Sequence, residues 1–338
     1  MEQLHSSALR AKGYEDLLAV VPYRLGFHPA DSIVALSLEG PRDRLGLAIR
    51  LDLPPIELVG EVTERILALL REQQTTRVLL VLYAADHRVA QPLVESLRPG
   101  LDEAGIDLVD AFRADGARWF SYTCAQDCCP PQGTPYDVTN HPFVAECVLA
   151  GGVALDSREE LRRSVAAPQG SARAAMDQAY ERAGSAVLNE LGAERADLIG
   201  TLQGYAAEVC RLVQDYLEHP RRLGDDEVAR LTTQVSAIPV RDAAWLLMDR
   251  SSARQHLSLW QQVLCRTGPE FVPAVACLTA FAAWLCGHGA LAWCAVERAL
   301  REDPDYSWAG LIVEALERGL SPQVWSHPGE RDLRDLAG

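Results

Sequence analysis

Segment 26–32 (Gly-Phe-His-Pro-Ala-Asp-Ser) carries the side chains of this chain that are best suited to chemistry. The imidazole of His28 and the carboxylate of Asp31 are three residues apart in the sequence, and such a pair can act as acid and base or hold a divalent metal. The alternative is structural: Asp31 bonds nearby backbone amides in a turn, while His28 packs on Phe27 with a ring nitrogen satisfied. Because polar loop residues usually serve turns, the structural interpretation ranks first.

The neighbouring elements predict which residues share an edge with this segment. Apolar runs at 32–38 and 45–51, joined by a short turn, predict a β-hairpin in which the first strand begins beside the end of the second. A right-handed crossover through a helix over 56–72 makes strand 77–83 parallel to strand 45–51, and ligands bind at the carboxyl edge of such strands. We expect one edge to hold the candidate catalytic residues His28, Asp31 and Asp52 and the candidate ligand-binding residues Ser32, Asp86 and His87.

A group of cysteines after the predicted sheet forms a second candidate site. Zinc sites use ligand pairs two to four residues apart, as Cys124 and Cys128 are, and His141 with Cys147 would complete a tetrahedron. The adjacent pair Cys128 and Cys129 departs from the usual Cys-x-x-Cys spacing. The favoured interpretation is therefore that these thiols pack at a domain junction, with no cofactor bound and a divalent metal as the alternative. A cysteine nucleophile is disfavoured because no histidine is close in sequence.

Two arginines at predicted helix starts, Arg158 and Arg241, are candidate anion ligands, because the amides at a helix N-terminus favour negative charge. The alternative, which ranks first, is that both are surface charges. The chain lacks the Gly-rich phosphate loop, the dinucleotide-binding Gly-x-Gly-x-x-Gly, His-Glu-x-x-His and Gly-x-Ser-x-Gly. These absences disfavour the standard nucleotide, zinc-protease and esterase chemistries.

The charge balance argues against two classes of partner. Lys and Arg number 32 against 47 Asp and Glu, so the net charge is −15 and the field of the molecule repels nucleic acids and anionic membranes. Segment 271–296 has no charged side chain, but Pro273 and the sequence Gly-His-Gly at 287–289 divide it into pieces shorter than the ~20 residues of a membrane span. We expect two buried helices there, and neither a nucleic-acid nor a membrane partner.

The cysteines predict a compartment. The chain has nine, an odd number, and most lie in apolar, helix-like segments where a free thiol behaves as a small hydrophobe. Its first residues lack the basic and apolar regions of a signal peptide. We expect free thiols and a cytoplasmic location.

Hydrophobic periodicity predicts an α/β fold with a mixed sheet, followed by helices alone. Helical stripes of apolar residues follow one another without a convincing strand from the capping box at 157–160 onward. The predicted organisation is an α/β mixed-sheet domain over 1–124, a crossing loop and connecting helix over 125–170, an all-α domain over 171–325 and a C-terminal tail over 326–338.

Two of the predicted helical segments have finer features. The helix over 89–104 is expected to break near Pro99 and Gly100. Near the C-terminus, Ala292, Ala299 and Pro304 have the spacing of the second helix and exit proline of a tetratricopeptide unit. A tetratricopeptide-like helical hairpin is therefore expected there, without a detectable second repeat.

Several short motifs together resemble one protein family. They are Leu-Gly-Phe-His-Pro-Ala-Asp-Ser at 25–32, Arg-Leu-Asp-Leu-Pro at 50–54, Arg-Trp-Phe-Ser-Tyr-Thr-Cys at 118–124, Cys-Cys-Pro-Pro at 128–131, and Trp284, Gly287, Gly289, Asp303 and Pro304. From about residue 13 to residue 325 the chain resembles a domain of unknown function found in high-GC Gram-positive bacteria. One departure is that the family places the first cysteine one residue further from the Cys-Cys pair. The resemblance implies no activity.

Two functions of different classes remain. The acidic composition, the predicted helical hairpin and the missing catalytic motifs favour a non-catalytic regulatory or interaction protein that binds a protein partner through its helical domain. The alternative is an enzyme or a small-molecule sensor that uses the sheet edge around His28 and Asp31.

Overall fold

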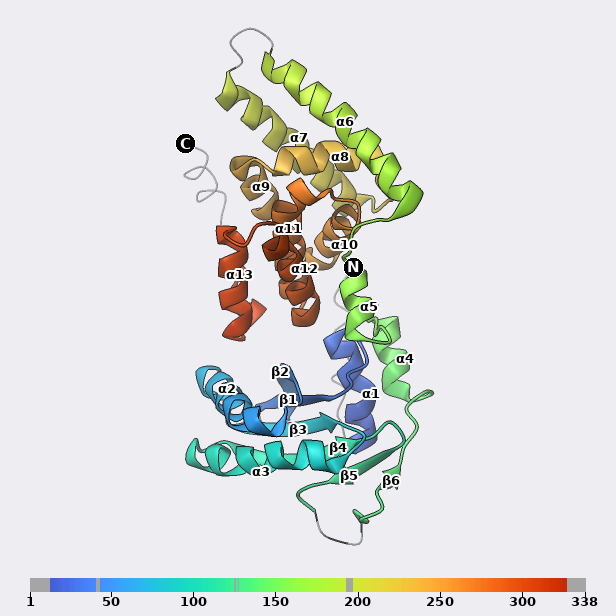
Figure 1. Cartoon of the computed structure of the whole chain (residues 1–338), viewed down its shortest axis with the longest axis vertical. Helices are drawn as coiled ribbons and strands as arrows, with labels where there is room; N and C mark the ends of the chain where they lie inside the picture. The colour runs from blue at the N-terminus through green and yellow to red at the C-terminus, as the bar shows by residue number, and fades with distance from the viewer. Residues whose placement is uncertain (1–12, 41–42, 125, 127, 193–196, 327–338) are drawn as a thin grey trace. The chain divides into compact units, whose positions relative to one another are not determined.

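The computed structural model describes residues 13–40, 43–124, 126, 128–192 and 197–326 (Figure 1). The chain forms two compact units. The first reaches to Arg158 and includes Arg318–Leu320; the second runs over Glu159–Glu317 and resumes at Ser321. The expected domain boundaries at residues 124 and 170 stay predictions, and the expected tail lies, from residue 327, outside the described residues.

Six strands form one sheet in the first unit, in the order β2-β1-β3-β4-β5-β6, and the sheet is mixed, as predicted. β3 and β4 pair in parallel and the other neighbouring strands pair antiparallel. Because β1 is antiparallel to both β2 and β3, these two run in the same direction, as the crossover requires. The strands are β1 (Ser32–Glu39), β2 (Arg44–Asp52), β3 (Arg77–Tyr83), β4 (Asp107–Ala114), β5 (Arg118–Ser121) and the unpredicted β6 (Thr134–Pro135).

Helices cover both faces of this sheet, which explains why β1 and β3 are almost wholly buried. The short 3-10 helix η1 (Ile56–Leu58) leads into α2 (Val59–Glu72), which packs with α3 (His87–Glu103) on one face, where Ala111 of β4 joins their core. The next residue, Phe112, points to the opposite face and contacts Tyr14 of α1 (Tyr14–Leu25). The first unit is therefore a helix–sheet–helix sandwich.

The predicted break in α3 is wrong, because the helix continues through Pro99 to Glu103. A Cβ atom at Gly100 would overlap the side chain of Leu67 in α2. The glycine therefore permits the close approach of α2 and α3, and the packing between them keeps α3 helical at Pro99.

One helix was not predicted. α4 (Pro142–Leu149) lies in the expected crossing loop. His141 caps it, since Nδ1 accepts a 3.2 Å hydrogen bond from the backbone N–H of Phe143, and proline at the first helical position favours such a start.

The second unit is helical, as predicted. α11 is apolar on all sides because it packs between α10 and α12 and leaves most of its side chains buried. Ala292 and Ala299 are fully buried in the α11–α12 hairpin. No helix among the described residues is both long and apolar enough to cross a bilayer. The elements are α5 (Arg158–Arg163), α6 (Gly170–Gly192), α7 (Leu198–Glu218), α8 (Asp225–Val235), α9 (Ile238–Trp245), α10 (Ala253–Leu264), η2 (Pro269–Phe271), α11 (Val272–Leu285), α12 (Gly289–Glu302), α13 (Ser307–Glu317) and η3 (Pro322–Val324).

Candidate functional site

The predicted sheet edge is formed. Ser32, the first residue of β1, pairs with Asp52 at the end of β2 and with Tyr83 at the end of β3. The backbone N–H of Leu53 donates a 2.9 Å hydrogen bond to the carbonyl oxygen of Asp31, which places Asp31 at the same edge. The structure therefore places Asp31, Ser32 and Asp52 at one edge, while the roles of the candidate site residues stay predictions.

Backbone contacts hold the polar segment in place. Asp31 has φ 42°, in the left-handed region that aspartate tolerates better than most residues. The backbone N–H of His28 donates to the carbonyl oxygen of Leu155 at 2.8 Å, and Leu155 N–H donates to Gly26 at 2.9 Å. The side chains of His28 and Asp31 are exposed. The backbone contacts hold the segment at the entry to β1, and the left-handed conformation of Asp31 favours a structural role for that residue, whereas these contacts do not involve the side chain of His28.

Arginines engage the carboxylates of this edge. Asp52 lies 2.6 Å from Arg50 Nη2 and 3.6 Å from Arg158 Nη1, so Arg158 lies at this edge, which the sequence did not predict. Asp86 caps α3, and hydrogen bonds from the side chain and backbone of Arg88 lower its pKa to about 2. His87 Nδ1 lies 3.4 Å from Asp86 Oδ1. Asp52 and Asp86 therefore each have a cationic partner.

Three buried polar atoms at the same edge lack a hydrogen-bond partner among the described residues: Ser32 Oγ, Arg50 Nε and the hydroxyl of Tyr83. Ser32 and Tyr83 face each other across β1 and β3, so their side chains leave the same face of the sheet. Burial raises the pKa of Tyr83. An unsatisfied buried polar atom costs about 1–3 kcal/mol, so this group of atoms favours a bound molecule or water.

The second site is a cluster of three thiols after β5, formed by Cys124, Cys128 and Cys129 and called the thiol cluster below. The Sγ atoms of Cys124 and Cys128 are 3.5 Å apart, those of Cys128 and Cys129 are 3.9 Å apart, and all three lie within 4.8 Å of one another. Ser121 Oγ accepts a 2.9 Å hydrogen bond from the N–H of Cys124. A 2.9 Å bond from the N–H of Cys129 to the carbonyl of Gln126 closes the turn.

The environment of the thiol cluster shifts the pKa values of two of its thiols in opposite directions. A backbone hydrogen bond with Gln126 and hydrogen bonds with the other two thiols lower the pKa of Cys124. Burial, followed by the hydrogen bonds with Cys124 and Cys128, raises the pKa of Cys129 to about 11. Asp110 of β4 lies close by, because its Oδ1 accepts a hydrogen bond from the hydroxyl of Thr123.

The structure changes the predicted ligand set. It brings Cys124 and Cys128 together but adds Cys129, while His141 and Cys147 are not in the cluster. Nε2 of His141 lies 3.1 Å from a carboxylate oxygen of Asp16, and its Nδ1 caps α4. Spacing alone disfavoured Cys129, yet the turn before it lets adjacent cysteines converge on Cys124.

The other arginine considered as an anion ligand is already paired. The guanidinium of Arg241 lies 2.6 Å from Asp242 Oδ1 and donates a 2.7 Å hydrogen bond to the hydroxyl of Tyr306. It also stacks over the ring of Trp308 at 4.8 Å. These contacts favour a packing role for Arg241.

Comparison with known proteins gives a family and no close relative. Neither the curated proteins nor the solved structures include a match to this chain. Residues 15–323, nearly the whole chain, match one family. The chain therefore belongs to the family described as a domain of unknown function, DUF4192.

Proposed function

We propose that this chain is a non-catalytic regulatory protein that binds Zn²⁺ through the thiolates of Cys124, Cys128 and Cys129. The spacing of the sulfur atoms carries the proposal. Zn–S bonds are about 2.3 Å long, so a tetrahedral site places its sulfur atoms about 3.8 Å apart. The separations of Cys128 Sγ from Cys124 Sγ and Cys129 Sγ, 3.5 and 3.9 Å, lie on either side of that value.

The surroundings support a metal at this position. Zinc binds thiolates, so the lowered pKa of Cys124 reduces the cost of releasing its proton. The carboxylate of Asp110, held by Tyr14 and Thr123, orients the segment that carries the cluster. Three protein ligands leave one position of a tetrahedron for water or another ligand.

Other features support a cytoplasmic location and a protein partner. All nine cysteines are free thiols, and a reducing cytoplasm keeps them so. Leu188 near the end of α6 and Leu198 and Ile199 at the start of α7 are 72%, 58% and 70% exposed. Exposed apolar side chains occur at interaction surfaces, and these three support a protein partner at the helical unit. Ile199→Asp should abolish partner capture, whereas Ile238→Asp, at another exposed position, should leave it unchanged.

Elemental analysis of the full chain, purified under reducing conditions and dialysed against buffer with equimolar Zn²⁺, tests the proposal. We expect one zinc per chain in the wild type and a loss of at least tenfold in affinity in Cys124→Ser, Cys128→Ser and Cys129→Ser. Cys147→Ser is the matched control, because it removes a half-buried thiol outside the cluster. Absence of zinc from the wild type, or equal zinc in the Cys124→Ser variant, would refute the site.

A second candidate function is a small-molecule sensor or an enzyme at the sheet edge. The unpartnered atoms of Ser32, Arg50 and Tyr83 favour it, because a polar ligand would satisfy them. The effect of Tyr83→Phe on thermal stability tests this candidate.

A further inference from the structure

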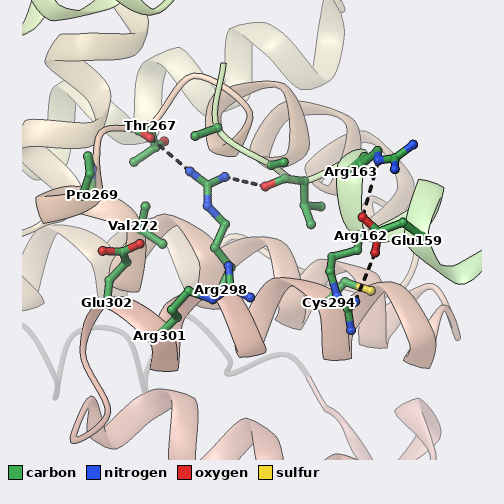
Figure 2. A pocket seen from close by; sticks show the side chains of 13 residues that line it. Glu159, Arg162, Arg163, Thr267, Pro269, Val272, Cys294, Arg298, Arg301 and Glu302 are labelled. Atoms are coloured by element: carbon green, nitrogen blue, oxygen red, sulfur yellow. Dashed lines mark hydrogen bonds and ion pairs between the residues drawn. The ribbon is translucent and has the colours of Figure 1, made fainter. Parts of the chain in front are cut away.

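A cavity of about 230 Å³ in the second unit is lined by more positive than negative charge (Figure 2). It lies between α5, the connection from α10 to α11, and α12. Four arginines and two glutamates line it, which gives four positive and two negative charges and a net charge of +2. The chain as a whole has a net charge of −15, so the net charge of the lining is opposite in sign to that of the chain.

Arg298 is a buried cation at this cavity without a carboxylate beside it. It is 7% exposed, and its guanidinium donates to the carbonyl oxygens of Val165, Leu264 at 2.7 Å and Thr267 at 3.1 Å. Carbonyl oxygens satisfy its hydrogen bonds but do not neutralise its charge. No carboxylate among the described residues lies within ion-pair distance of it.

Two further lining arginines have unused donors. Arg301 forms no hydrogen bond or ion pair with any residue that the structure describes, and its side chain is exposed. Arg162 pairs with Glu159 and Glu297 through its terminal nitrogens, whereas Arg163, 70% exposed, pairs with Glu159 only through Nε and keeps its terminal nitrogens free among the described residues. Unused donors therefore come from both α5 and α12.

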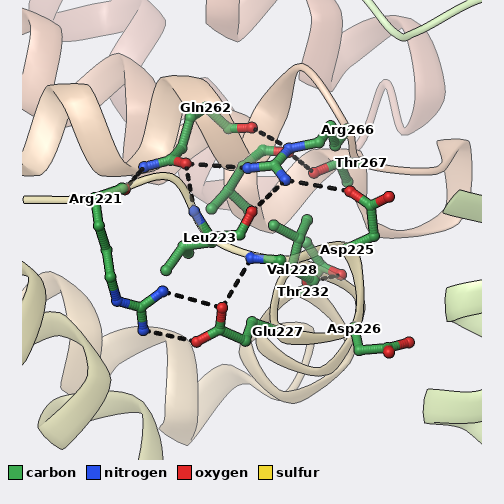
Figure 3. A network of polar contacts seen from close by, with 12 residues as sticks. Arg221, Leu223, Asp225, Asp226, Glu227, Val228, Thr232, Gln262, Arg266 and Thr267 are labelled. Carbon is green, nitrogen blue, oxygen red and sulfur yellow. Dashed lines mark hydrogen bonds and ion pairs between the residues drawn. The ribbon is translucent and has the colours of Figure 1, made fainter. Parts of the chain in front are cut away.

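Other arginines of the same unit behave differently, as the polar network at the start of α8 demonstrates (Figure 3). Arg221 forms two hydrogen bonds with Glu227, at 3.0 and 2.7 Å. Arg266 lies 3.3 Å from Asp225 and also donates to the carbonyl of Leu223. There each of the two positive charges has a carboxylate partner, unlike Arg298 and Arg301 at the cavity.

We propose that this cavity binds a phosphate group, either as inorganic phosphate or as a small phosphate monoester. The guanidinium group matches phosphate oxygens in a fork geometry. Donors from opposite walls suit a tetrahedral anion better than a planar carboxylate, which takes its donors in one plane. A bound phosphate would link α5 to α12 and stabilise the helical unit by mass action. This site is independent of the thiol cluster.

Isothermal titration of the full chain with inorganic phosphate and with methyl phosphate, at constant ionic strength, tests the site. We expect saturable binding at one site per chain and at least tenfold weaker binding in Arg301→Gln. That side chain is exposed, so its loss should leave the fold intact. Arg173→Gln is the matched control, because Arg173 forms a surface pair with Asp177 on α6 and should bind as the wild type does.

The two titrants separate the sources of the ligand. Binding of inorganic phosphate alone assigns the site to free phosphate, and binding of both assigns it to a monoester. An equal response to chloride at the same ionic strength would overturn the proposal. Wild-type affinity in Arg301→Gln, or no saturable binding by the wild type, would also overturn it.

Discussion

The hydroxyl of Tyr14, in the first turn of α1, donates a 2.6 Å hydrogen bond to Oδ2 of Asp110 in β4. The other oxygen of Asp110 accepts a hydrogen bond from the hydroxyl of Thr123, the residue before Cys124. One carboxylate therefore connects α1, β4 and the segment that leads into the thiol cluster. Groups that orient metal ligands in this way affect metal affinity without touching the metal.

Tyr14→Phe should weaken zinc binding about tenfold, at the lower end of the effect of such orienting groups. The substitution keeps the ring that packs on Phe112 and Trp119 and removes only the bond to Asp110. Competition with a chromogenic chelator measures the affinity. Tyr23→Phe on the same helix is the control, and zinc affinity equal to wild type in Tyr14→Phe would contradict the role of Asp110.

Asp31→Ala should lower the free energy of unfolding by about 1 kcal/mol, because Asp31 has φ 42° and a left-handed conformation penalises alanine. Asp31→Gly should recover the loss, since glycine adopts this conformation freely. His28→Ala removes an exposed side chain and should change stability by less than about 0.5 kcal/mol. Urea unfolding measures all three, and equal losses in His28→Ala and Asp31→Ala would argue against the turn assignment.

Tyr83→Phe distinguishes the two interpretations of the sheet edge. If the buried hydroxyl has no partner in the protein in solution, its removal should stabilise the fold by about 1–3 kcal/mol. If a bound molecule satisfies it, the same change should destabilise the fold, as the sensor or enzyme candidate requires. Thermal unfolding measures the sign of the stability change, with Tyr136→Phe as the control. A gain in stability in Tyr83→Phe would favour a structural role for this edge.

The stability of the second unit should fall between pH 6.5 and pH 4 because of His256. Burial lowers the pKa of this fully buried histidine from 6.5 to about 4, so the folded state holds it neutral. Below pH 6.5 the imidazole of His256 becomes protonated in the unfolded chain but stays neutral in the folded chain until about pH 4. This difference destabilises the fold by up to about 3 kcal/mol. Above pH 6.5 this contribution is complete and constant.

Urea unfolding as a function of pH measures this effect. His256→Gln keeps a donor for the carbonyl of Leu247, which lies 3.2 Å from His256 Nε2, but it does not titrate. The variant should therefore lose less stability than the wild type across this range. The same loss in both proteins would exclude His256 as the cause.

Sequence patterns predicted the elements well but predicted the site only in part. Strand direction alone places Ser32 beside Asp52, because the start of one hairpin arm must lie beside the end of the other. Spacing did not reveal Cys129 as the third thiol, since a turn between residues 126 and 129 decides where it points. The sequence also did not predict the arginines of the cavity. Tertiary packing brings Arg162 and Arg298 to one cavity, and no local sequence pattern indicates that they lie near each other.

X-ray absorption at the zinc edge of the loaded full chain tests the central claim most directly, because it counts the sulfur atoms bound to the metal. The account predicts three sulfur scatterers at about 2.3 Å and one lighter atom. It also predicts two sulfur scatterers in the Cys129→Ser variant if metal is retained. A zinc shell of nitrogen and oxygen alone, or a wild-type shell unchanged in Cys129→Ser, would contradict it.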